Sequence, residues 1–198
     1  ENFPYHDFTD LNQLEAVAIA QDQKAMGIEE DVLAYDPNSG LEALDREKMA
    51  KYIETYAMSR NNAWVDISAY GGDCQNFASQ VLYEGGAPMT ISGDYHWYFN
   101  SLEDRSPAWT GVDFMYDFIR LNRGQGPQGI ETNTWRQLDI GDMILIDWTY
   151  DGVLDHTTTV NHSGKQARVS GHTRDNYNER ISDLGGLKFY IHVKGYQK

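Results

Sequence analysis

The sequence has little cysteine, few basic residues and no long apolar run, and each shortage excludes a class of function. One cysteine among 198 residues permits neither an internal disulfide nor a zinc site built from several thiolates. Sixteen basic residues against thirty acidic ones give a net charge of −14, so nucleic acid and anionic membrane surfaces are not expected partners. No apolar stretch approaches the length of a membrane span. The single cysteine, Cys74, is left with packing or reactivity.

The length and the hydrophobic content of 40% predict one folded domain with an N-terminal extension. Residues 1–42 begin with a helix start signal at Thr9-Asp10, continue with apolar residues at helical spacing and end in the breaker at 36–40. We expect a helical arm with a linker there, and a domain over residues 43–198. The chain opens at Glu1, so any targeting segment is expected to have been removed or to lie outside this sequence.

Three more helices are predicted in the first two thirds of the chain. One begins at its cap, Asp45, and extends to about Arg60. The next begins at Cys74, with Asp73 as its cap and the preceding glycine pair allowing a sharp entry, and it ends at Gly85-Gly86. The third spans residues 111–121, where apolar residues again follow helical spacing.

From residue 138 onward the pattern changes from helical to alternating. Strands are expected at residues 143–148 and 153–161, joined by a turn at Asp151-Gly152, and near residues 167–171 after a turn at Ser163-Gly164. A last strand from Leu187 alternates apolar and polar residues, which is typical of a sheet with one solvent-facing side. Helices followed by an antiparallel sheet predict an α+β fold.

Cys74 lies in the first turn of its predicted helix, where backbone N–H groups lower the pKa of a thiol below its ordinary value of about 8.5. In most chains a lone cysteine is simply a small buried apolar residue. The Gly-Gly-Asp-Cys entry favours a nucleophile instead. A nearby imidazolium would lower the thiol pKa further.

A cysteine nucleophile needs a base, and His156 on the second predicted strand is the best of six histidines. If Ser163-Gly164 forms the next turn, His172 or Gly171 falls opposite His156. A base and an orienting partner require such a pair. A register error of one residue would move His172 to the other face, so the pairing stays open.

Other signals are weaker. Asp147, Asp151 and Asp155 are spaced by four residues, which does not follow the ligand pattern of a cation loop. The aromatic run at residues 95–99 could line a cleft, although large aromatic residues are more often core. A Gly-x-Ser-x-Gly elbow and a phosphate-binding loop are both absent. We therefore expect neither a metal nor a cofactor.

Together these residues resemble the putative amidase domain family over about residues 43–196. The segment around Cys74, Gly-Asp-Cys-Gln-Asn-Phe-Ala-Ser-Gln, is its most specific part. The resemblance is also carried by Asp45-Arg46 with Tyr52 and Tyr56, Gly85-Gly86, Trp109-Thr110, Gly141-Asp142, Asp155-His156 and His172-Thr173.

The family is similar to CHAP and NlpC-type cell-wall hydrolases, which have a papain-like core. By that resemblance Cys74 is the nucleophile, His156 the base and His172 the best match for the third catalytic residue, with Asp175 and Asn176 nearby. The implied substrate is an amide or peptide bond of peptidoglycan, and the implied location is secreted or on the surface of a bacterium. Because the chain is acidic, binding to an anionic wall is expected to be local to the cleft or supplied by a separate wall-targeting domain or protein.

The developing oxyanion is expected to be met by the Cys74 N–H, with Tyr70 or Ser68 as a second donor. Two alternatives remain: a catalytically silent cell-surface or adhesion module of the same fold, and a cysteine protease or transpeptidase that acts on protein. The residues expected to bind substrate or oxyanion are Tyr70, Ser68, Asp73, Trp97, Trp109 and Asp175.

Overall fold

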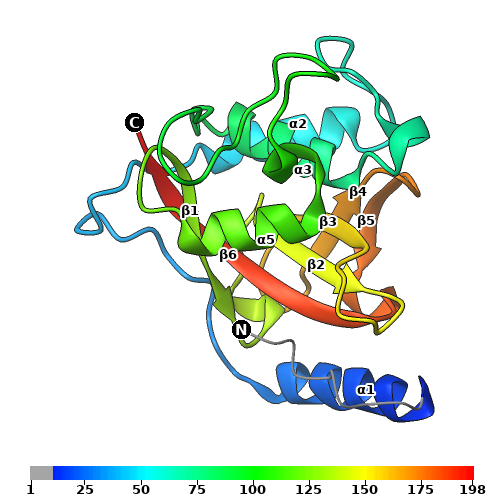
Figure 1. Ribbon diagram of the computed structural model, residues 1–198. Helices are drawn as coiled ribbons and strands as arrows, with labels where there is room; N and C mark the ends of the chain where they lie inside the picture. Colours follow the sequence, from blue (N-terminus) through cyan, green and yellow to red (C-terminus); the bar gives the residue numbers. More distant parts are fainter. Residues whose placement is uncertain (1–10) are drawn as a thin grey trace.

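The computed structural model describes residues 11–198 and contains helices packed on a six-stranded antiparallel sheet (Figure 1), which confirms the α+β prediction. The predicted start signal at Thr9-Asp10 lies outside the described residues. None of the described helices is long and apolar enough to cross a membrane. The helices are α1 (Leu11–Gly27), α2 (Arg46–Tyr56), α3 (Cys74–Glu84), α4 (Pro107–Thr110) and α5 (Val112–Leu121), with short 3-10 turns at Ser68–Tyr70, Trp135–Gln137 and Ile181–Asp183.

The sheet has the strand order β1-β6-β2-β3-β4-β5. Two of these strands were not predicted, because β1 contains glycine and proline and β5 is almost entirely polar. The tight turn expected at Asp151-Gly152 is replaced by a longer loop, because β3 begins only at His156. The strands are β1 (Gly126–Thr132), β2 (Met143–Asp147), β3 (His156–His162), β4 (Arg168–Gly171), β5 (Asn176–Arg180) and β6 (Leu187–Gln197).

The helix boundaries follow local chemistry with two differences from prediction. Asp45 caps α2 as expected, because its Oδ1 accepts a hydrogen bond from Lys48 N at 3.0 Å, but the helix ends at Tyr56 rather than near Arg60. Asp73 occupies the N-cap position of α3 without capping it, since its side chain makes no hydrogen bond to the helix backbone. The Asp73 carboxylate is used elsewhere, as described below.

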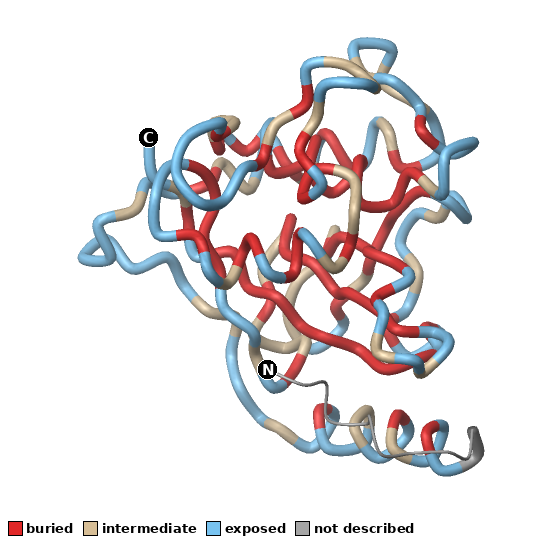
Figure 2. Tube along the Cα trace, viewed as in Figure 1, coloured by how far each residue is buried: buried red, intermediate tan, exposed pale blue. Residues whose placement is uncertain are grey.

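Apolar residues pack on both faces of the sheet. Met143 and Leu145 of β2 belong to the cluster that includes α2, α3 and α5, whereas Ile144 and Ile146 belong to a second cluster that includes Ala25 of α1. Strands β2, β3 and β6 are buried along most of their length (Figure 2), whereas β5 is not.

This arrangement corrects the prediction that β6 has a solvent-facing side. Lys188 is buried because its Nζ binds Asp22 of α1 at 2.8 Å, and Gln21 bonds the Lys188 backbone. Tyr190 and His192 are buried as well. Lys188 and His192 are buried because Asp22 of α1 and Asp142 supply their polar partners, whereas Lys194 stays exposed as predicted.

A buried polar triad joins α2 to the sheet. Arg46 Nη1 donates to Asp142 Oδ1 at 2.7 Å, and His192 Nδ1 donates to Asp142 Oδ2 at 2.7 Å. Burial acts to raise the pKa of Asp142, but the positive charge of Arg46 and the bond from His192 hold it below its ordinary value. The Asp45-Arg46 and Gly141-Asp142 motifs therefore have a structural use.

Candidate active site

Cys74 is the first residue of α3 and is buried, with 6% of its surface exposed. The chain enters the helix through Gly71 and Gly72, whose φ angles of 111° and 120° lie in the left-handed region that favours glycine. A Cβ on Gly72 would lie 2.9 Å from Thr173 Oγ1. Glycine is therefore required where the entry to α3 passes the end of β4.

The environment of the thiol contains opposing influences. Burial raises the pKa of Cys74 above its ordinary value, while the Thr157 N–H, the Thr173 hydroxyl and the N–H groups at the helix start all favour the ionised sulfur. The net direction is upward, contrary to the expectation of a lowered pKa. The reason is that desolvation of the thiolate exceeds the effect of the donors around it.

His156, the first residue of β3, is buried as a neutral ring. Its ring stacks on Trp148 with centroids 4.5 Å apart, and its Nδ1 is buried without a hydrogen-bond partner. Burial lowers the pKa of His156 to about 4, and the positive charge of Arg174 acts in the same direction. The ring is thus available to accept a proton at neutral pH, but it is not the imidazolium expected beside the thiol.

The ring of His156 and the thiol of Cys74 are not in hydrogen-bond contact. Thr157 Oγ1 donates to Gln75 of α3 at 2.7 Å, so Thr157 faces the helix. Because successive strand residues alternate, His156 points to the opposite face, which it shares with its cross-strand neighbour Ile146. The two candidates are nevertheless close along the backbone, since Thr157, whose N–H contacts the thiol, follows His156 directly.

His172 is held by partners other than His156. Its Nδ1 donates to Asp73 Oδ2 at 2.6 Å and its Nε2 donates to the Tyr56 carbonyl at 2.8 Å, while the ring stacks on Phe77. A carbonyl only accepts, so Nε2 donates to Tyr56, and Nδ1 is occupied by the Asp73 carboxyl group. His172 therefore has no nitrogen left with which to orient His156.

The register explains the difference from prediction. Thr159 lies opposite Ser170 and Val160 opposite Val169. β4 ends at Gly171, so His172 and Thr173 lie in the turn that follows, and neither pairs with His156 in the sheet. His172 lies on the side of α3, where its ring stacks on Phe77.

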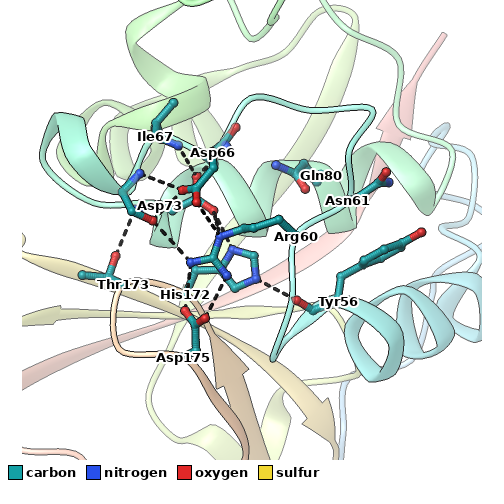
Figure 3. A network of polar contacts seen from close by, with 12 residues as sticks. Tyr56, Arg60, Asn61, Asp66, Ile67, Asp73, Gln80, His172, Thr173 and Asp175 are labelled. Atoms are coloured by element: carbon teal, nitrogen blue, oxygen red, sulfur yellow. Dashed lines mark hydrogen bonds and ion pairs between the residues drawn. The ribbon is translucent and has the colours of Figure 1, made fainter.

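The pair of Asp73 and His172 belongs to a wider charged network (Figure 3). Arg60 lies 3.4 Å from both Asp66 and Asp73 through its Nε and binds Asp175 through both terminal nitrogens at 2.9 and 3.0 Å. Asp73 Oδ1 also accepts from Ile67 N at 3.1 Å. The network joins the end of α2, the entry to α3 and the turn after β4, so Asp73 and Asp175 fix the loops around Cys74.

The polar residues of the Cys74 motif mostly hold α3 in place. Asn76 Oδ1 accepts from Trp109 Nε1 at 2.9 Å, Ser79 Oγ accepts from Trp97 Nε1 at 3.1 Å, and Gln80 Oε1 accepts from Tyr52 at 2.7 Å. Trp97 and Trp109 are fully buried and pack against each other, so they form core rather than the expected substrate-binding surface.

Both proposed second oxyanion donors are exposed, Tyr70 with 66% of its surface, but within the part of the chain that the structure describes only the Ser68 hydroxyl is already bonded. The Ser68 hydroxyl donates to Asp66 and accepts from Arg60. Ser68 is thus part of the charged network, and Tyr70 is the better placed of the two to meet a substrate.

Asp147 at the end of β2, with Asp151 and Asp155 in the loop that follows, accepts backbone hydrogen bonds that shape the loop before His156. Asp147 accepts from the backbone N–H groups of Tyr150 and Gly152, and Asp155 accepts from Trp148 N at 2.7 Å. Among the residues that the structure describes, no group of three metal-binding side chains is close enough to hold an ion. These carboxylates position Trp148 against His156.

Sequence reasoning missed Trp148, Thr157 and Thr173 as members of the site. Threonine and tryptophan carry no signal of their own for catalysis. The position of Thr173 follows from the turn after β4, and the stacking of Trp148 follows from a loop longer than the predicted turn. Both required spatial information.

The lowered pKa of His156 predicts a pH-dependent stability. Between about pH 6.5 and the folded pKa of about 4, the unfolded ring binds a proton that the folded ring does not. The free energy of unfolding should therefore be largest above pH 6.5 and fall on acidification, by up to about 3 kcal/mol from this residue. Urea unfolding at several pH values should give a free energy of unfolding that changes less with pH for His156→Gln than for the wild type. The exposed His162→Gln serves as control, and equal slopes for both variants would contradict the assignment.

A family model described as a putative amidase domain matches residues 43–193. The chain belongs to this family. It is also 32% identical over 136 residues to the uncharacterized protein YhbB of Bacillus subtilis (strain 168), a match that covers 66% of this chain and 42% of that protein. No solved structure matches the chain. Family membership supports amide hydrolysis as a coarse function.

Proposed function

We propose that this putative amidase domain is a cysteine-dependent amide hydrolase in which Cys74 is the nucleophile. The observation that carries the proposal is the setting of the thiol. The sulfur lies at a helix start, and donors from α3, β3 and the turn after β4 favour its ionised form. Donors that stabilise a thiolate suit a group that must become negative as it reacts.

His156 is the proposed base, because its state is not explained by packing. The buried Nδ1 of His156 has no hydrogen-bond partner among the described residues, which costs about 1–3 kcal/mol of stability. Both ring nitrogens of His172, by contrast, have partners. A neutral imidazole can accept a proton, and the proposal requires the start of β3 to rearrange so that the ring leaves Trp148 and reaches the thiol beside Thr157. Catalytic hydrogen bonds often form only when substrate is bound.

In the proposed reaction His156 removes the thiol proton as sulfur attacks the amide carbon. The tetrahedral oxyanion is met by the N–H of Cys74 at the helix start, with Tyr70 as a second donor. The His156 imidazolium then protonates the leaving nitrogen, and an amine and a thioester form. Water attacks the thioester, gives its proton to His156 and releases a carboxylic acid and the free thiol.

The proposed substrate is an amide or peptide bond of bacterial peptidoglycan, on the basis of the resemblance to papain-like cell-wall hydrolases. The same resemblance supports a secreted or cell-surface location. The net charge of −14 opposes general attraction to an anionic wall, so we infer binding confined to the cleft or help from a wall-targeting partner.

A mass-spectrometric survey tests this function. Purified muropeptides, intact walls of several types and unrelated peptides are incubated with the protein and with protein alkylated at Cys74, its sole cysteine. New amines and matching carboxylates from muropeptides, absent with the alkylated protein, are expected. Cleavage or transfer only among unrelated peptides would replace peptidoglycan by protein as the substrate.

One observation favours a second candidate, a catalytically silent surface or adhesion module. Burial raises the thiol pKa, and the His156 ring does not bond the thiol. Both features are expected of a domain that has kept its fold and lost catalytic activity. If the survey finds no product from any wall or peptide, the silent module becomes the better description.

A further inference from the structure

Thr173 has an unusual backbone conformation next to Cys74. Its φ of 82° lies in the left-handed region, which is costly for a β-branched residue. This conformation turns the side chain towards the entry of α3, where Thr173 Oγ1 accepts a hydrogen bond from Asp73 N at 3.0 Å. Gly72 leaves the space that the hydroxyl occupies.

Hydrogen-bond accounting then fixes the direction of the hydroxyl proton. A threonine hydroxyl has one proton to donate and lone pairs to accept with. Because Thr173 Oγ1 accepts from the Asp73 N–H, its own proton remains available next to Cys74, the following residue, whose thiol pKa the Thr173 hydroxyl acts to lower. The strained backbone thus has an effect at the sulfur rather than in the packing alone.

We propose that Thr173 is a catalytic residue whose hydroxyl donates a hydrogen bond to the Cys74 sulfur and holds it for attack. This inference rests on the proposed function in taking Cys74 as the nucleophile. Thr173 transfers no proton: the thiol proton goes to His156, and the hydroxyl keeps its own when the sulfur–carbon bond forms.

Alkylation of Cys74 by iodoacetamide as a function of pH tests the proposal without requiring turnover. Thr173→Val keeps the shape of the side chain and removes the donor, so the midpoint of labelling should rise by about one pH unit, with about tenfold slower labelling below it. Thr173→Ser keeps the donor and should label within about threefold of the wild type. The matched control is Thr159→Val, because the Thr159 hydroxyl is buried without a partner and should be replaceable.

A second variant guards against misfolding of Thr173→Val. Thr173→Gly also lacks the hydroxyl, but glycine accepts the left-handed backbone, so this variant should fold and show the same shift in midpoint. Unchanged midpoints in Thr173→Val or Thr173→Gly would overturn the inference, even if the wild type hydrolyses amides through Cys74. Shifted midpoints in a protein without turnover would support the contact and count against the proposed function alone.

Discussion

Replacing Cys74 with alanine is expected to lower kcat/KM for the cleaved amide at least about a thousandfold while the protein stays folded. The change removes the attacking atom and leaves only binding and oxyanion stabilisation. The stability loss should be small, about 1 kcal/mol, because one sulfur atom is lost from a helix that many other contacts hold. Amine release and thermal unfolding by circular dichroism measure the two effects.

The variant Cys74→Ser distinguishes the loss of the nucleophile from the loss of packing. Serine fills nearly the same space, but its hydroxyl does not ionise in this range, so the variant should be as stable as the wild type and almost inactive. Acid quench of the wild type during turnover should trap an acyl group on Cys74 with the mass of the substrate fragment. Substantial hydrolysis by Cys74→Ala would exclude this residue as the nucleophile.

The same substitution at the two histidines is expected to have opposite effects. His172→Phe should lower the free energy of unfolding by about 2–5 kcal/mol, because the buried Asp73 carboxyl group and the Tyr56 carbonyl each lose a hydrogen bond. His156→Phe should leave stability unchanged or slightly higher, since it removes an unpartnered nitrogen and keeps a ring against Trp148. Turnover should be lost in His156→Phe.

Urea unfolding and kcat/KM, measured at a temperature where both variants are folded, distinguish the two roles. Strong destabilisation by His156→Phe with full activity would contradict its assignment as the base. A His172→Phe protein with wild-type stability would mean that the pair of Asp73 and His172 contributes nothing to folding.

Local chemistry was enough to predict the helices around the site. The glycine entry, the apolar spacing and the Gly85-Gly86 end place α3 at the observed residues, and Asp45 caps α2 as expected. The α+β order followed from the change of periodicity near residue 138. These features depend on neighbours within a few residues, which a sequence displays directly.

The features that decide the site depend on register and on long-range partners. A shift of one or two positions between β3 and β4 separates His172 from His156, and the turn after β4 brings the Thr173 hydroxyl to Asp73 N, next to Cys74. The Asp73 carboxylate does not cap α3 but binds His172, which is 99 positions away in the sequence. The polar side of β6 is buried because α1 supplies Asp22 to Lys188, which alternation along one strand cannot reveal.

The many bonds made by the polar residues of α3 affect how relatives of this protein can be sorted. A search keyed to Gln75, Asn76, Ser79 and Gln80 would retrieve chains that share the packing around Trp97 and Trp109, whether or not they catalyse anything. Positions whose reactive atoms hold no other residue in place are more informative, above all Cys74 and His156, whose Nδ1 has no hydrogen-bond partner in the described part of the chain. A relative that keeps the tryptophan contacts but has lost either of these two side chains would be expected to fold alike and to be inert.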